Sequence, residues 1–513
     1  MKKKLLSIVS VIILVFLCVS CGKKDFGEAP FGIYEIDFSE EPVTITYLTI
    51  GNKPTNGQTE AVIEKLNKKL RKKINAQLDV YYISWDDYLT NYNYTLDAGE
   101  AGIDLVGTGT DWLDTWPNVM KGNFYPLTEE MLRKYCPGTY SDVTPNQWNK
   151  CSYEGNIYFI PENNYSQWTN HGFIYRGDIA DKAGIGNIES WQELTDYMEY
   201  VADYYPEMIP WDADGKNTII TLGYLMSASS YAPIYELGTY ELWGAYQSDM
   251  RKIISPYYEG DELVEFAKLM KKWDSIGVWR KDFSLSENNE DEFYAGITAA
   301  TQHHTQNYYT EIKPLMEIEQ PDSDVRFFWF GTESANLMKT SIMHGAMAVY
   351  AGSKNPERAL MVYDLLRNDE ECYRLIRYGI EGSQYIVNKE GMLERPSGYN
   401  YDRDNIVLNF WWGRRDEMEV PDSEFSWADY YKLVDGYANV AIDYPWDGIP
   451  FMTADTEEEI KPILEVCDKF IPEITYAKYS CTPEEEVELF RNALKEAGFE
   501  KVTFKLQKIL NLY

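Results

Sequence analysis

The pattern of apolar and polar positions predicts alternating strands and helices where the folded chain begins. Residues 43–50 form a β-rich run that is ended by Gly-Asn-Lys-Pro. Apolar residues then recur on one side of a predicted helix across residues 61–70. Further strands are predicted at residues 78–83 and 103–106. A strand, helix, strand, helix, strand order is typical of a parallel α/β sheet, so we expect the α/β class.

The rest of the chain is predicted to be rich in helix with short strands. Capping boxes, in which a Ser or Thr is followed three residues later by Glu, begin at Ser190, Thr456 and Thr482. Asn355 and the proline after it predict the start of another helix. No internal repeat or low-complexity tract is visible in the sequence.

The first 20 residues predict a secretory signal that is removed from the mature chain. Three lysines precede an apolar run at residues 5–17, which is shorter than the ~18 to 20 residues that span a bilayer as a helix. The small residues before Cys21 resemble the lipobox of bacterial lipoproteins, with Cys18 where a leucine is usual. This resemblance implies a lipidated Cys21, a tether over residues 21–42 and a location outside the cytoplasm. The alternative is an ordinary cleaved signal with an incidental cysteine.

Composition narrows the classes of ligand. A net charge of -34 argues against nucleic acid, because phosphate binding requires clusters of Lys and Arg. Aromatic residues make up 15% of the chain, with 42 Tyr and 15 Trp, and a carbohydrate cleft would use such rings to stack on sugars. The four histidines and scattered cysteines show no metal-binding spacing, so we expect no metal and no cofactor. Cys136 and Cys151 are predicted either to form a disulfide or to be buried thiols.

The carboxyl ends of the first and third predicted strands mark a candidate ligand rim. Ligands of open α/β sheets bind just beyond the carboxyl ends of the strands. This rule places residues 51–53 and 108–112 at the same edge of the sheet.

An ordered set of segments resembles the extracellular solute-binding proteins of ABC importers. The resemblance is to the carbohydrate-type family that includes maltose-binding protein, and within it to the long lipoprotein branch. The segments that carry it are the lipobox, Asp104–Trp112, Tyr158–Pro161, Gly172–Ile185, Trp191–Leu194, Phe293–Gly296, Ser353–Leu360, Gly379–Gly382 and a helical end at Leu489–Leu512.

The family implies a periplasmic-binding-protein-like fold of two α/β lobes, with a hinge and a ligand cleft between them. We therefore expect a monomer that captures a carbohydrate, most simply an oligosaccharide, and delivers it to an ABC permease. The first lobe is expected at residues 43–165 and about 341–382, and the second at residues 166–340 and about 383–513.

The resemblance implies ligand contacts at the rim of the first lobe. Asn52 ends the first strand, where the family places polar contacts, although a simple turn would also explain it. Thr110, Asp111 and Trp112 follow the third strand at a sugar-contacting loop. Asp111 can accept two hydroxyl hydrogen bonds and Trp112 can offer a ring, while helix capping is the alternative role for Asp111.

Further contacts are implied from the lobe crossings and the second lobe. Trp168 lies in the first crossing and is predicted either to line the cleft or to pack the hinge. His303 follows a strand near a family contact, with a structural histidine as the alternative. Trp411, Trp412 and Arg414 are expected from the second lobe, with one Trp stacking on the ligand and Arg414 bonding either the ligand or a surface carboxylate.

Other functions fit part of the same pattern. A lipid-anchored glycoside hydrolase would also have a ring-lined cleft, but no nucleophile-elbow or metal motif is present. A binder of peptides or other polar nutrients, and a binder that signals to a membrane sensor, remain alternatives. The prediction is therefore a binding protein with no catalytic residues.

Overall fold

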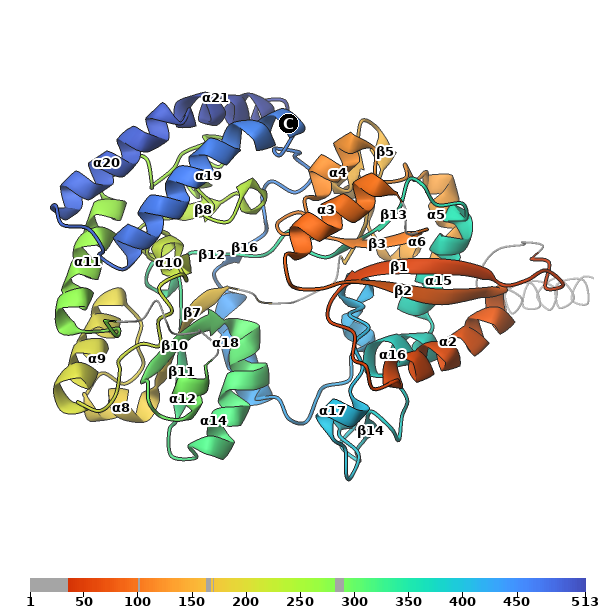
Figure 1. The fold of residues 1–513 in the computed structure, drawn as a ribbon, viewed down its shortest axis with the longest axis horizontal. Coiled ribbons are helices and arrows are strands. Elements are labelled where there is room, and N and C mark those ends of the chain that lie inside the picture. Colours follow the sequence, from red (N-terminus) through yellow and green to blue (C-terminus); the bar gives the residue numbers. More distant parts are fainter. Residues whose placement is uncertain (1–35, 100–101, 163–167, 169, 282–289) are drawn as a thin grey trace, which may run out of the picture.

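The computed structural model describes residues 36–99, 102–162, 168, 170–281 and 290–513. The predicted signal, Cys21 and most of the predicted tether lie outside these residues. Within the described part of the chain, no helix is long and apolar enough to cross a membrane. The described residues form two lobes, with the N-terminal sheet in one and the C-terminal helices in the other (Figure 1).

Lobe one is built on a five-stranded mixed sheet with the order β2-β1-β3-β13-β6. Strand β1 pairs in parallel with both β2 and β3, as the sequence predicts, whereas β13 runs antiparallel to β3 and β6. The strands are β1 (Val43–Ile50), β2 (Ala76–Ile83), β3 (Leu105–Thr108), β6 (Ile160–Pro161) and β13 (Ala346–Val349).

Helices cover the sheet of lobe one and bury its apolar residues. The longest of them, α2 (Gln58–Ile74), buries Val62, Leu66, Leu70 and Ile74 against the core, as its apolar stripe predicts. The other helices of this lobe are α3 (Tyr88–Ala98), α4 (Thr115–Lys121), α5 (Glu129–Tyr135), α6 (Pro137–Asp142), α7 (Pro145–Lys150), α15 (Pro356–Asn368), α16 (Glu370–Tyr378) and α17 (Tyr401–Asp404).

Lobe two surrounds a three-stranded antiparallel sheet with the order β10-β7-β11. These strands are β7 (His171–Arg176), β10 (Ala300–His304) and β11 (Val325–Trp329). Short strands pair outside this sheet: β8 (Tyr231–Pro233) with β9 (Gly244–Tyr246), and β12 (Leu337–Met338) with β16 (Ala441–Ile442).

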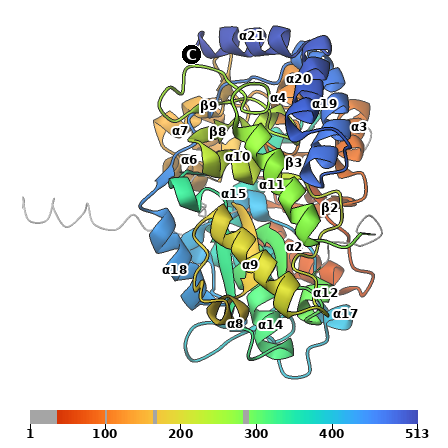
Figure 2. The same ribbon diagram turned by 90° about the vertical axis from the view of Figure 1, so that its left-hand side faces the viewer.

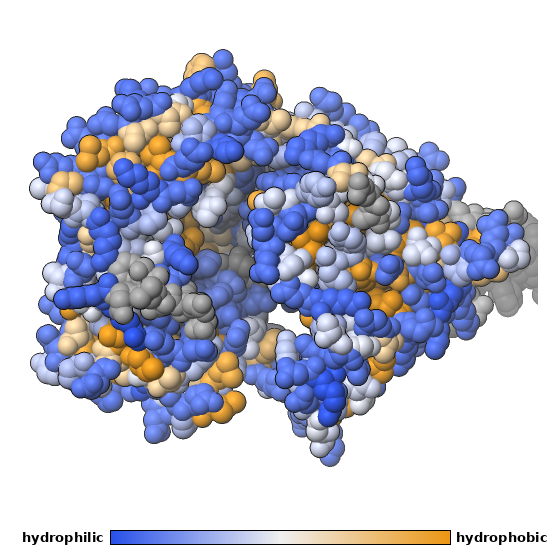
Figure 3. Space-filling model, in the orientation of Figure 1, coloured by the Kyte–Doolittle hydropathy of each residue, from blue (hydrophilic) through white to orange (hydrophobic). Residues whose placement is uncertain are grey.

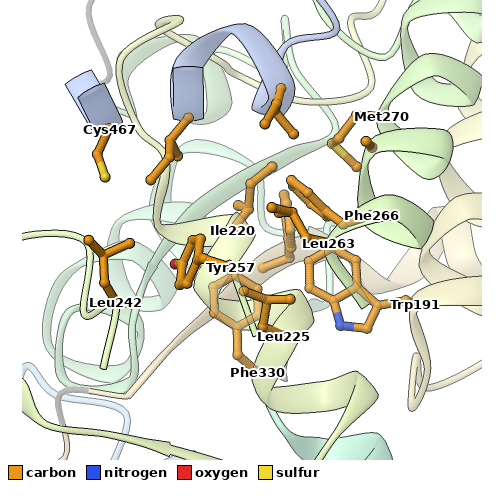
Figure 4. Packing of buried hydrophobic residues seen from close by; sticks show 14 of the residues in the cluster. Trp191, Ile220, Leu225, Leu242, Tyr257, Leu263, Phe266, Met270, Phe330 and Cys467 are labelled. Atoms are coloured by element: carbon orange, nitrogen blue, oxygen red, sulfur yellow. The ribbon is translucent and has the colours of Figure 1, made fainter. Parts of the chain in front are cut away.

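The helices of lobe two enclose an aromatic core. They include α8 (Gly177–Lys182), α9 (Trp191–Tyr204), α10 (Ile219–Ala228), α11 (Glu262–Ile276), α14 (Lys313–Glu319), α18 (Trp427–Tyr437), α19 (Ala454–Thr475), α20 (Pro483–Glu496) and α21 (Phe499–Leu510). Helices α9 and α11 form the outer face of the lobe (Figure 2). In the core, the rings of Trp191 and Phe330 stack with centroids 5.6 Å apart (Figure 4).

Two of the three predicted capping boxes begin helices where expected. The Ser190 side chain accepts a hydrogen bond from the Glu193 amide at the start of α9, and Thr482 forms a complete box at the start of α20. The box predicted at Thr456 is wrong, because α19 begins one turn earlier. Its capping side chain is Thr453, and Thr456 is buried inside the first turn.

The last return to lobe two lies later in the chain than the sequence predicts. Leu408, Phe410 and Trp412 are buried in the core of lobe one, so the expected boundary near residue 383 is wrong. Among the described residues, the chain hydrogen-bonds to lobe two through its backbone at Ser426, whose amide donates to the Tyr309 carbonyl at 2.9 Å. Trp411, Trp412 and Arg414 therefore belong to lobe one or its edge, not to lobe two.

Segments 339–345 and 413–425 connect the two cores, and the chain also passes from lobe one to lobe two between Glu162 and Asn170. Between the lobes the surface is hollowed (Figure 3). Next to the middle connection, Lys150 of lobe one forms an ion pair with Asp447 of lobe two at 3.1 Å, and the Asp447 side chain is only 3% exposed. Cys136 and Cys151 are buried free thiols, so the structure contains no disulfide between them.

The burial of Trp412 gives a test of the corrected boundary. Its ring is 0% exposed and its carbonyl accepts a hydrogen bond from Tyr363 of α15 at 2.7 Å. We expect Trp412→Ala to lower the free energy of unfolding by about 3–5 kcal/mol, measured by chemical denaturation. Tyr431→Ala, at a 57% exposed ring of α18, is the control and should change it by about 0.5 kcal/mol or less. An equal, small effect of both variants would contradict the boundary.

Candidate functional site

Three loops meet at the carboxyl edge of the lobe-one sheet. Because β1, β2 and β3 are parallel, the residues after each strand lie at the same edge. The Asn52 carboxamide oxygen accepts hydrogen bonds from the Ser84 hydroxyl at 2.8 Å and the Trp85 amide at 3.3 Å. Asn52 is thus exposed at the predicted rim, where it holds the loop that carries Trp85.

Tryptophan rings form a stack on this edge. The ring of Trp112 lies nearly parallel to that of Trp412, with centroids 5.9 Å apart and an angle of 10°. Trp112 also stacks with Trp85 at 6.3 Å and 23°, and Trp411 contacts Trp85 at 6.0 Å. The stack runs from the fully buried Trp412 to Trp85, which is 43% exposed. An exposed, supported ring of this kind offers a flat apolar surface to a ligand.

Glycines allow the rings to approach the backbone of the edge. A Cβ atom at Gly107 would lie 2.5 Å from the Trp412 ring. A Cβ atom at Gly109 would lie 2.3 Å from the Trp112 Nε1 atom and 2.4 Å from the His344 carbonyl oxygen. Both glycines of the Gly-Thr-Gly sequence are therefore required by this packing.

Thr110, Asp111 and Trp112 each form a hydrogen bond with the middle crossing, residues 339–345. The Thr110 amide donates to the Met343 carbonyl at 3.0 Å. The Trp112 indole N–H donates to the His344 carbonyl at 2.8 Å, and an Asp111 carboxylate oxygen lies 2.7 Å from His344 Nδ1. Asp111 thus pairs with a histidine, and no helix-capping bond from its side chain is seen among the described residues.

The Asp111–His344 pair sets the charge at the base of the cleft. Burial alone would lower the pKa of His344, but the negative charge of Asp111 and their hydrogen bond outweigh it and raise this pKa to about 9. His344 is therefore a cation at neutral pH. Burial also raises the pKa of Glu162 to about 8, although the charge of His344 opposes that shift.

A cavity of about 210 Å³ lies between the lobes next to this pair. Asp111 contributes from lobe one, and Trp168, Asn170 and Thr340 contribute from the crossings. Lobe two supplies an apolar wall of Ile219, Leu222, Gly223, Met226, Phe330, Leu337 and Met338, together with the polar residues His171, Tyr235 and Glu241. The cavity combines a large apolar surface with a few polar groups, as small-molecule sites do.

Of the remaining predicted residues, Trp168 lines the cavity, whereas His303 and Arg414 do not. Trp168 also packs on Tyr437 of α18, with ring centroids 4.9 Å apart, and its contact with a ligand stays a prediction. His303 stacks on His171 at 6.2 Å, and it is His171 that lines the cavity. Arg414 pairs with Asp416 at 3.2 Å and lines a separate hollow of about 610 Å³.

Sequence reasoning missed Trp85, Glu241 and His344. Trp85 follows the second strand by two residues, so the strand-end rule that selected Trp112 would also have found it. His344 lies at a crossing whose partner loop is more than 230 residues away in sequence. Glu241 lies in a loop of lobe two with a left-handed backbone, at φ 51°, and no sequence pattern marks it.

Two lobes linked by crossing segments, with a cavity between them, make up the two-lobed fold that the sequence resemblance implies. The comparisons confirm the predicted resemblance to the carbohydrate-type proteins of ABC importers. A carbohydrate ABC transporter substrate-binding protein from Streptococcus pneumoniae is 23% identical over 496 residues, covering 92% of this chain and 91% of that protein. No family model matches the chain.

Solved structures share the fold over nearly the whole chain. The N-glycan transport solute-binding protein NgtS from Streptococcus pneumoniae superposes with a TM-score of 0.70 at 20% identity, covering 91% of this chain and 98% of that one. Its complex with Man1GlcNAc gives 0.64 at 18% identity, with the same coverage. The alginate-binding protein AlgQ2 gives 0.64 at 14% identity, covering 93% and 100%.

The pKa of His344 predicts a pH-dependent contribution to stability. The folded-state value near 9 is above the usual value of about 6.5, so the ion pair stabilises the fold fully below pH ~6.5 and is lost as pH rises through about 9. We expect the wild type to exceed His344→Gln by about 2 kcal/mol in free energy of unfolding at pH 6. Chemical denaturation at pH 6 and pH 10 measures this difference, which should largely disappear at pH 10. A difference that grows with pH would contradict the assignment.

Proposed function

We propose that this chain is an extracytoplasmic binding protein that captures an oligosaccharide between its two lobes for an ABC importer. The observation that carries the proposal is the stack of Trp85, Trp112 and Trp412 at the edge of lobe one, beside a cavity with carboxyl groups. Sugar rings present apolar faces and many hydroxyl groups, and this edge offers a surface for each. NgtS, which has a related fold, has been solved with Man1GlcNAc.

Ligand capture would stabilise a closed arrangement of the lobes. A ligand favours closure only by the free energy of the extra contacts it makes in the closed state. Here Asp111 is contributed by lobe one and Glu241 by lobe two, while Trp168 and Thr340 come from the crossings. A sugar in the cavity would touch all of these parts together, so that its binding couples to hinge motion.

The N-terminal sequence supports a membrane-anchored location for this function. A lipid on Cys21 would hold the lobes near a permease through a tether of about 20 residues. A permease and a membrane sensor are both partners that such an anchored binder would serve. The similarity to a substrate-binding protein of a carbohydrate ABC transporter favours the permease.

We also propose that the chain binds its sugar without turnover. The proteins to which it is similar are named as substrate-binding proteins. One carboxyl group of the cavity is paired with His344 and the other comes from the opposite lobe, an arrangement that suits hydrogen bonding to sugar hydroxyl groups. Incubation of the protein with the bound glycan should therefore release no shorter sugar.

A thermal-shift screen identifies the ligand class. Bound ligand raises stability by RT ln(1 + [L]/Kd), so a ligand at 100 times its Kd adds about 2.7 kcal/mol. We expect hits among oligosaccharides, including mannosyl-GlcNAc glycans, and none among peptides or polyamines. A response to peptides alone would contradict the proposal.

The tryptophan stack predicts which variants lose the sugar. We expect Trp85→Ala to weaken binding of the best oligosaccharide about tenfold, or ~1.4 kcal/mol, because a supported stacking surface is removed. Isothermal titration calorimetry measures the change. Tyr204→Ala, at a 69% exposed ring on the outer helix α9, is the matched control and should bind like the wild type. Equal affinity of Trp85→Ala and Tyr204→Ala would contradict the placement of the ligand on the stack.

A further inference from the structure

Two carboxyl groups from opposite lobes face one cavity, and each keeps an oxygen that has no hydrogen-bond partner among the described residues. One oxygen of Asp111 is paired with His344, but Asp111 Oδ1 is buried without a partner. Glu241 Oε2 is likewise buried without a partner. Both residues line the cavity. Leaving a buried acceptor unsatisfied is costly, so a ligand that supplies donors to both would be favoured.

The described residues that line the cavity provide no Lys or Arg that could pair with a charged ligand. His171 lines the cavity as well, but burial and the neighbouring His303 lower the pKa of His171 to about 3, so that its ring is neutral. The cation that contacts this lining is His344, whose Nδ1 atom lies 2.7 Å from an Asp111 carboxylate oxygen.

The carboxyl groups of the cavity disfavour a further negative charge. Burial first, and then the charge of Asp111, raise the pKa of Glu241 to about 8. Burial thus favours the neutral form of Glu241, while Asp111 and His344 pair with each other. A buried carboxylate brought in by a ligand would have no counter-ion, and this is unfavourable unless a cation pairs with it.

We propose that the cavity selects an uncharged, hydroxyl-rich sugar residue and excludes uronic acids. The hydroxyl groups of such a residue would donate to Asp111 from lobe one and to Glu241 from lobe two, while its C–H faces pack on the apolar wall that includes Met226, Phe330 and Met338. This proposal rests on the proposed carbohydrate binding and gives it a chemical specificity. It also separates this chain from a fold relative named for binding alginate, which is a polymer of uronic acids.

Matched pairs of sugars test the selectivity. The probes are disaccharides of GlcNAc with terminal mannose, glucose or galactose, each compared with its counterpart in which C6 of that terminal sugar is a carboxylate. We expect the best uncharged member to bind at least 100-fold more tightly than its uronate in calorimetry at pH 7. Equal binding of both members, or tighter binding of the uronate, would overturn the selectivity but leave carbohydrate binding intact. If no sugar in the pairs or in the wider oligosaccharide screen binds, the proposed function and this inference both fail.

Two variants test the cause of the selectivity. Thr340→Lys places a cation at the cavity, and we expect it to reduce the preference for the uncharged sugar from at least 100-fold to below tenfold. Asp111→Asn removes the fixed negative charge with little change in shape and should reduce the preference at least tenfold. Ser141→Lys adds the same charge as Thr340→Lys on the exposed surface of α6 and should leave the preference unchanged. An unchanged preference in both cavity variants would overturn the electrostatic explanation.

Discussion

The packing of Trp412 on Gly107 is the contact on which the candidate site depends. It joins a segment more than 300 residues downstream to the central strand of lobe one, in a space that only glycine leaves open. Trp112 stacks with that ring, and Trp85 stacks with Trp112. Removing the buried ring would therefore also remove the support that orients the exposed ones.

The middle crossing links this edge to the hinge. Met343 and His344 accept hydrogen bonds from Thr110 and Trp112, and His344 pairs with Asp111. This segment connects strand β12 of lobe two to strand β13 of lobe one. A change in the angle between the lobes would therefore move the residues that are proposed to contact the sugar. These hydrogen bonds give the proposed binding and closure a direct structural link.

Local patterns in the sequence predicted the first sheet well. The β-rich run at Val43–Ile50 and the apolar stripe of α2 follow from periodicity, and the strand-end rule correctly placed Asp111 beside the cleft. The segment around Trp412 was assigned to the wrong lobe because its burial depends on a long-range contact with Gly107. His344 and Glu241 were missed for the same reason, since their environments arise from residues that are distant in sequence. Tertiary packing decides such positions, and no periodic signal records it.

The central claim is that one sugar is held by both lobes at this cleft. Amide hydrogen exchange measured with and without a saturating oligosaccharide tests it directly, because exchange reports local protection segment by segment. If both lobes hold the sugar, residues 84–88 and 109–113 in lobe one and residues 235–242 in lobe two should be protected simultaneously. Protection confined to one lobe, or found only at the separate hollow around Arg414, would contradict it.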